Sequence, residues 1–208
     1  SLTQWLLLAP VLLISLTVHE LSHGLAAYML GDNTAKREGR LSLNPIKHID
    51  PIGLIMLFVV GFGWAKPVPV DPSYFREPKR GMAITALAGP LSNILLAFVS
   101  ALGLSLAYGG NALYYSSENI AVIFAQQFFL YNCAIAMFNL LPIPPLDGSK
   151  IVGAFLPNRL YYKMLYFERY GMIILILLLG TGIFSGVLSN GVRNLMRLIL
   201  NTISLMGL

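Results

Sequence analysis

The chain has 208 residues, of which 56% are hydrophobic and only 11% are charged, and its mean hydropathy is +0.71. These values lie outside the usual range of soluble globular proteins and indicate one integral membrane domain in contact with a lipid bilayer. The net charge of +5 comes from clustered Lys and Arg residues, with no basic and aromatic stripe that would indicate RNA or DNA as a partner. Nothing in the composition indicates an oligomeric state.

Four apolar stretches predict membrane-spanning helices, at about residues 5–30, 81–108, 119–141 and 166–188. They predict an all-α polytopic membrane protein with a three-helix core and a fourth span. A C-terminal helix is expected at about residues 190–206, with Arg193 and Arg197 on a polar stripe and Leu and Ile opposite. Such an amphipathic helix favours the membrane interface, and a fifth span is the alternative.

The stretch from Asp32 to Arg80 carries eight of the fourteen basic residues, which places it on the cytoplasmic side. Its middle part, about residues 35–75, is predicted to be a re-entrant or extended loop that can form a small β-hairpin. The apolar run inside it, Ile52 to Phe62, is too short to span a membrane and is interrupted by glycine. The loop from Gly109 to Ser117 has no Lys or Arg and is predicted to face outside.

The motif His19-Glu20-Leu21-Ser22-His23 lies within the first predicted span. Residues four apart on a helix lie on one face, so His19 and His23 can bind the same metal ion. Two histidines at this spacing with a glutamate after the first are the zincin signature, in which zinc is bound and the glutamate is the general base of peptide hydrolysis. Ionisable residues inside a membrane are costly and are functional by default.

A catalytic zinc ion usually has three protein ligands, so a third residue is needed. Asp147 is the preferred candidate, because it follows the inward end of the third span and reaches the depth of the histidines. His48 in the basic loop and Glu168 at the start of the fourth span are the alternatives. Glu168 is expected to pair with Arg169 or to be solvated, and Glu118 is excluded by depth. The single cysteine, Cys133, cannot form an intrachain disulfide and is expected to be a small core residue.

Three segments in this order resemble the site-2 protease family of intramembrane zinc metalloproteases: His19 to His23, Ala88 to Asn93, and Asn139 to Gly148. The loop from Asn44 to Pro51 is similar to that of compact bacterial members. The resemblance implies that His19, His23 and Asp147 bind one zinc ion, that Glu20 is the catalytic base, and that the protein lies in a bacterial cell membrane. A chain of this length is expected to lack the PDZ and CBS domains of larger members.

The resemblance implies hydrolysis of peptide bonds in or near transmembrane segments of membrane protein substrates, with the active site toward the cytoplasm. Asn93 is the candidate catalytic donor to the tetrahedral intermediate, and helix packing is its alternative role. Gly148 is expected to permit a tight turn that presents Asp147. The competing functions are a metal-binding membrane transporter and a catalytically silent zinc-binding scaffold.

A transmembrane substrate must unwind before its peptide carbonyls can be attacked. We expect extended backbone of the cytoplasmic loop to pair with the opened substrate strand by β-augmentation. Residues 39–44 and residues 66–70 are the two candidate segments, the second because its prolines exclude a helix.

Overall fold

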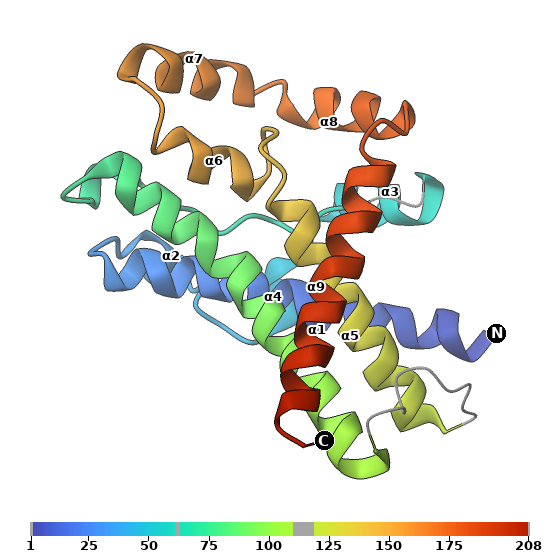
Figure 1. Cartoon of the computed structure of the whole chain (residues 1–208). Helices are drawn as coiled ribbons and strands as arrows, with labels where there is room; N and C mark the ends of the chain where they lie inside the picture. The colour runs from blue at the N-terminus through green and yellow to red at the C-terminus, as the bar shows by residue number, and fades with distance from the viewer. Residues whose placement is uncertain (1, 61–62, 110–118, 208) are drawn as a thin grey trace.

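The computed structural model describes residues 2–60, 63–109 and 119–207. These residues form helices in the order α1 (Leu2–Met29), α2 (Thr34–Arg37), the 3-10 helix η1 (Pro45–His48), α3 (Pro51–Val60), the 3-10 helix η2 (Pro72–Tyr74), α4 (Pro78–Tyr108), α5 (Ile120–Asn139), α6 (Asp147–Gly153), α7 (Asn158–Glu168), α8 (Gly171–Gly180) and α9 (Ser185–Leu205) (Figure 1). The described residues contain no β-strand, which confirms the all-α class. The predicted outer loop falls on residues 110–118, outside the described part of the chain.

Helices α1, α4 and α5 are long and apolar enough to cross a membrane, and they pack against one another (Figure 1). Their relative directions follow from the residues that meet between them. His19 contacts Asn93 and His23 contacts Thr85, so α4 runs antiparallel to α1. Asn93 of α4 contacts Asn132 of α5 and Ser100 contacts Ala125, so α5 runs antiparallel to α4. The ends of α1 and α5 and the start of α4 therefore lie on one side of the protein, and the chain is a multi-pass membrane protein.

Small residues let α4 approach α5 and α9 closely. The core cluster that they form consists of Ala97, Ala101, Phe129, Cys133, Ile199 and Ile203. Cys133 is fully buried in this cluster, which confirms its expected place in the core. Helix α9 packs its apolar face against α4 and α5 and exposes Arg193 and Arg197, so the predicted amphipathic pattern serves helix packing here.

The predicted fourth span at residues 166–188 is not one helix. It is divided among α7, α8 and α9, and α8 and α9 meet at 91°. The ten residues of α8 extend only ~15 Å, half the thickness of a hydrocarbon core. Gly182 causes the second break, because its φ of +71° is open to glycine and costly for other residues. Among the described residues, a fourth span exists only if α8 and α9 form one broken span.

Helix α8 instead covers the turn between α5 and α6. Leu175 is buried against Leu141 and Leu146, and a side chain at Gly171 would lie 2.8 Å from the backbone of Pro144. The run is as apolar as a membrane span, but in the structure it packs against the turn that presents Asp147.

The loop region between α1 and α4 contains the short helix α3 and one isolated antiparallel bridge between Ile49 and Ala65. The expected hairpin is therefore reduced to a single bridge in the described residues. The first candidate edge, residues 39–44, is bent, with the backbone N–H of Ser42 donating to the Arg40 carbonyl at 2.9 Å. The second candidate, residues 66–70, has no helical structure and lies beside α1, with Val68 in contact with Glu20.

Candidate metal centre

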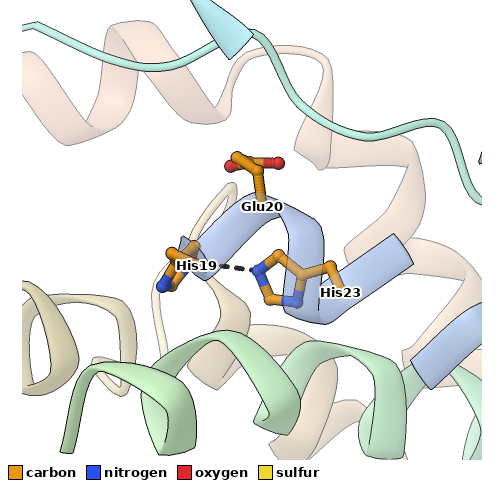
Figure 2. Close-up of side chains that lie close together, drawn as sticks. All are labelled: His19, Glu20 and His23. Atoms are coloured by element: carbon orange, nitrogen blue, oxygen red, sulfur yellow. Dashed lines mark hydrogen bonds between the residues drawn. The ribbon is translucent and has the colours of Figure 1, made fainter. Parts of the chain in front are cut away.

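His19 and His23 lie on one face of α1 and are 3% and 9% exposed. Their rings meet edge to face with centroids 4.6 Å apart, and the two Nε2 atoms are 3.0 Å apart (Figure 2). The four-residue spacing on a helix produces this convergence, as the sequence predicts.

Neighbouring oxygens determine where each imidazole carries its hydrogen. His19 Nδ1 lies 2.6 Å from Asn93 Oδ1, and His23 Nδ1 lies 2.7 Å from the carbonyl oxygen of Thr85. Both oxygens are acceptors, so both Nδ1 atoms are donors, and each neutral ring turns an unprotonated Nε2 toward the other. This is the tautomer in which histidine binds a metal through Nε2.

Asp147 completes the convergence from a different part of the chain. Its Oδ2 lies 3.2 Å from His19 Nε2 and 3.3 Å from His23 Nε2, and the residue is 7% exposed. It is the first residue of α6 and follows the turn after α5. Gly148 is required beside it, because a Cβ there would lie 2.3 Å from the Leu140 carbonyl and 2.4 Å from the Leu141 carbonyl.

The three converging atoms fit a metal ion. Zinc with nitrogen and oxygen ligands at ~2.0–2.2 Å in a tetrahedron keeps those ligands ~3.3–3.6 Å apart. The observed separations of 3.0, 3.2 and 3.3 Å are close to these edges. Asp147 Oδ2 is buried and has no hydrogen-bond partner among the described residues, so a bound cation would satisfy an otherwise unpaired acceptor.

The electrostatic balance at Asp147 agrees with a carboxylate rather than a carboxylic acid. Burial raises the pKa of the Asp147 carboxyl, but protons that His19 and His23 carry toward it lower the pKa by more, and the net shift is downward. A cation bound in place of those protons would favour the carboxylate in the same way. The group is therefore available as an anionic ligand over the physiological pH range.

Helix α4 leaves room for the rings only because position 89 is glycine. A Cβ at Gly89 would lie 2.5 Å from His23 Nε2 and 2.6 Å from His19 Cε1. The α4 backbone thus forms the floor of the site, and Thr85, Gly89 and Asn93 face α1 at four-residue intervals.

Asn93 has a different environment from the one that an oxyanion donor requires. Its amide nitrogen donates to Asn132 Oδ1 at 2.7 Å and to the Ser15 carbonyl at 3.3 Å, while its oxygen faces His19. Asn132 in turn donates to Ser15 Oγ at 2.8 Å, and all three residues are fully buried. Both functions of the Asn93 amide are engaged, so the geometry supports orientation of His19. Asn132 and Ser15 both lie outside the three sequence motifs on which the predicted site rests.

Glu20 lies on the other side of α1 from α4, facing the extended loop (Figure 2). Its Oε2 accepts a hydrogen bond from Val68 N–H at 2.9 Å, and the Glu20 side chain is half-buried. A carboxylate oxygen of Glu20 and ligand atoms of both histidines lie within 4.8 Å of one another. The candidate base Glu20 is thus adjacent to the histidine pair, although Asp147 lies closer to the two histidines than Glu20 does.

The alternative ligands lie elsewhere. His48 is buried, but its Nε2 contacts the Ser42 carbonyl at 2.8 Å. Glu168 forms an ion pair with Lys150 at 3.7 Å, whereas the expected partner Arg169 stacks on Tyr166 and Tyr170. Glu118 lies outside the described residues.

Comparisons with known proteins identify the family of the chain. The model of peptidase family M50 matches residues 113–179, the part of the chain that contains Asp147. Over 183 residues the chain is 44% identical to "Putative zinc metalloprotease YwhC" of Bacillus subtilis (strain 168), covering 87% of this chain and 83% of that protein. The chain belongs to peptidase family M50, the site-2 protease family.

Two further relatives match at lower identity. "Putative zinc metalloprotease Rip2" of Mycolicibacterium smegmatis (strain ATCC 700084 / mc(2)155) is 32% identical over 174 residues, 81% of this chain and 64% of that protein. "Putative zinc metalloprotease MJ0611" of Methanocaldococcus jannaschii is 36% identical over 103 residues, 49% of each chain. No solved structure matches significantly. Membership in family M50 identifies the protein as a zinc metalloprotease and confirms the resemblance seen in its sequence.

Proposed function

We propose that this zinc metalloprotease hydrolyses peptide bonds in or near the transmembrane segments of membrane proteins. The observation that carries the proposal is the convergence of three acceptor atoms, from His19, His23 and Asp147, in a buried position between membrane-crossing helices. A protease with its site at this depth requires a substrate that enters the membrane.

The proposed roles follow from the contacts. His19, His23 and Asp147 would hold the zinc ion, which would supply a Lewis acid that makes water nucleophilic near neutral pH and polarises a carbonyl group. Glu20 takes the proton from the attacking water and gives it to the leaving amine. Asn93 orients His19, and hydrogen bonds of this kind to a ligand's second nitrogen fix its tautomer and its direction.

We further propose that the site opens toward the cytoplasm of a bacterial cell. The end of α1, the start of α4 and the end of α5 lie on the side of the basic segment that contains Lys36 and Arg80. Positive residues accumulate in cytoplasmic loops, which supports this orientation.

Substitution of Glu20 by Gln tests the hydrolytic role. The purified protein, reconstituted in vesicles with a library of fluorescent single-pass transmembrane peptides, is expected to cleave some of them, with products identified by mass spectrometry. Glu20→Gln is expected to retain one zinc ion per chain and to lose cleavage by more than about a thousandfold, since it removes the proton acceptor.

The same assay separates the alternatives. Glu38→Gln is a matched control, because Glu38 is exposed at the end of α2. Cleavage by the Glu20→Gln protein at the wild-type rate would show that the proposed base is wrong. Zinc transport into the vesicles without any peptide cleavage would favour a transporter.

A further inference from the structure

We infer that Arg40 is a positioning residue for Glu20, because it holds the extended backbone whose Val68 N–H contacts the Glu20 carboxylate. The inference rests on the proposed role of Glu20 as the base. It concerns residues 66–71, here called the strap, which cross the side of α1 opposite α4.

Arg40 is buried in an unusual way for a charged side chain. It is 6% exposed, and one guanidinium nitrogen donates to the carbonyl oxygen of Lys66 at 2.7 Å. No described carboxylate forms an ion pair with Arg40, and its Nε is buried without a hydrogen-bond partner. Burial of an unpaired charge is costly, so a guanidinium retained here requires a purpose other than stability.

The local sequence directs Arg40 inward. Helix α2 ends at Arg37, and Gly39 then adopts a φ of +65°, a left-handed conformation that favours glycine. The backbone N–H of Arg40 donates to the Ala35 carbonyl at 2.8 Å, which closes the turn. The chain reverses at this point, and Arg40 extends toward the strap.

The strap is fixed to its surroundings at separate points. Lys66 N–H donates to the His48 carbonyl at 2.8 Å, and Lys66 O accepts from Arg40. In the middle, Val68 N–H donates to Glu20 Oε2 at 2.9 Å, and at the far end Asp71 N–H donates to Asp32 Oδ2 at 2.7 Å. Arg40 and Asp32 therefore hold the two ends, with the Glu20 contact between them.

Because of two prolines, the hydrogen bond to Glu20 depends on the register of the strap. Pro67 and Pro69 have no N–H, so Val68 carries the one amide hydrogen between Lys66 and Val70. A shift of one residue in either direction would present a proline to Glu20 and remove the hydrogen bond. Arg40, bound two residues before Val68, is placed to prevent that shift.

The first test is Arg40→Met, which keeps an unbranched apolar stem and removes both the charge and the donors of the guanidinium. With the transmembrane peptide cleaved by the wild type, kcat is expected to fall about 10- to 100-fold, the effect of losing one charge-assisted hydrogen bond, with little change in KM. Zinc content is expected to stay at one per chain. Amide hydrogen exchange in residues 66–71 is expected to accelerate. Arg40→Lys retains a donor and is expected to recover part of kcat.

Arg37→Met is the matched control, because Arg37 is an exposed arginine of the same loop that hydrogen-bonds to Tyr74 Oη. It is expected to change neither kcat nor the rate of amide hydrogen exchange in the strap. Equal kcat and equal strap exchange in the Arg40→Met protein and the wild type would overturn the inference.

A second set of variants tests the atom through which Arg40 acts. Val68→Pro removes the N–H within an already proline-rich segment, and Val68→Ala retains it. Val70→Pro is the control, since Val70 N–H donates no hydrogen bond within the part of the chain that the structure describes. Val68→Pro is expected to lower kcat as Arg40→Met does, and the double variant to lose no more than either alone.

Multiplicative losses in that double variant would show that Arg40 does not act through Val68 and would overturn the inference. Failure of the proposed function is distinguishable, because the wild type would then cleave no peptide at all. Strap exchange in the Arg40→Met protein still tests the link between Arg40 and the strap in that case.

Discussion

The two sides of α1 hold their functional groups in different ways. Toward α4 and α5, the imidazoles are oriented by fully buried side chains and by a helix backbone, through Asn93, Asn132 and Thr85. Toward the strap, the half-buried Glu20 is held by one backbone N–H from a loop. The geometry of the proposed zinc ligands thus depends on helix register, whereas the position of the proposed base depends on loop register. Variants on the two sides should separate zinc affinity from turnover.

The largest effect on the helix side is expected for Gly89→Ala. The added Cβ would lie 2.5 to 2.6 Å from atoms of both rings, far inside van der Waals contact, so the imidazoles must rotate away. Removing a group that only orients a ligand lowers metal affinity ~10–100-fold, and displacing two ligands should lower it by more. We expect zinc content well below one per chain and no measurable cleavage.

Gly103→Ala on the same helix is the control for Gly89→Ala, since a Cβ there meets nothing within 4 Å. Zinc content is measured by atomic absorption of the purified proteins. Full zinc occupancy in the Gly89→Ala protein would show that α4 does not form the floor of the metal centre.

A smaller effect on zinc affinity is expected for Asn93→Ala. Loss of the acceptor for His19 Nδ1–H should weaken zinc binding about 10- to 100-fold, measured by competition with a chelator. Asn93→Asp retains an acceptor oxygen and lacks the amide donor, so it should bind zinc more tightly than Asn93→Ala. Asn139→Ala is the control, because among the described residues the Asn139 side chain donates only to the Ile135 carbonyl of its own helix. The reverse order of the Asp and Ala variants would argue for amide donation at Asn93.

The smallest effect is expected for Glu168→Gln, which tests the other carboxylate considered as a ligand. Its ion pair with Lys150 is partly exposed, and such pairs contribute less than about 1 kcal/mol. Zinc content and cleavage should therefore equal those of the wild type, whereas Asp147→Asn should lower both. A loss of zinc from the Glu168→Gln protein would contradict the assignment of Asp147.

The convergence of the proposed ligands could be predicted from the sequence in part because it follows from helix periodicity. His19 and His23 are four residues apart, and the depth argument pointed to Asp147, which the structure places 3.2 and 3.3 Å from their Nε2 atoms. The role of Asn93 was harder to predict. Position on a helix face shows that its amide points inward, but only the partners Ser15 and Asn132 show which way its donors are directed.

The C-terminal third was predicted less well, for a physical reason. Hydropathy measures the apolar content of residues 166–188, and a helix that covers a turn is as apolar as one that faces lipid. The breaks depend on Gly171 meeting Pro144 and on the left-handed Gly182. The strap contacts depend on pairs that are distant in the chain, Glu20 with Val68 and Arg40 with Lys66, and no local pattern predicts such pairs.

The buried triangle of Ser15, Asn93 and Asn132 has a consequence for biogenesis. These polar groups enter the bilayer on separate helices, and the hydrogen bonds among them form only when α1, α4 and α5 associate. The same association brings Asn93 and Thr85 to the imidazoles that they orient. Helix assembly in the membrane and maturation of the enzyme are thus one event, and a newly inserted α1 alone cannot present a loaded metal centre.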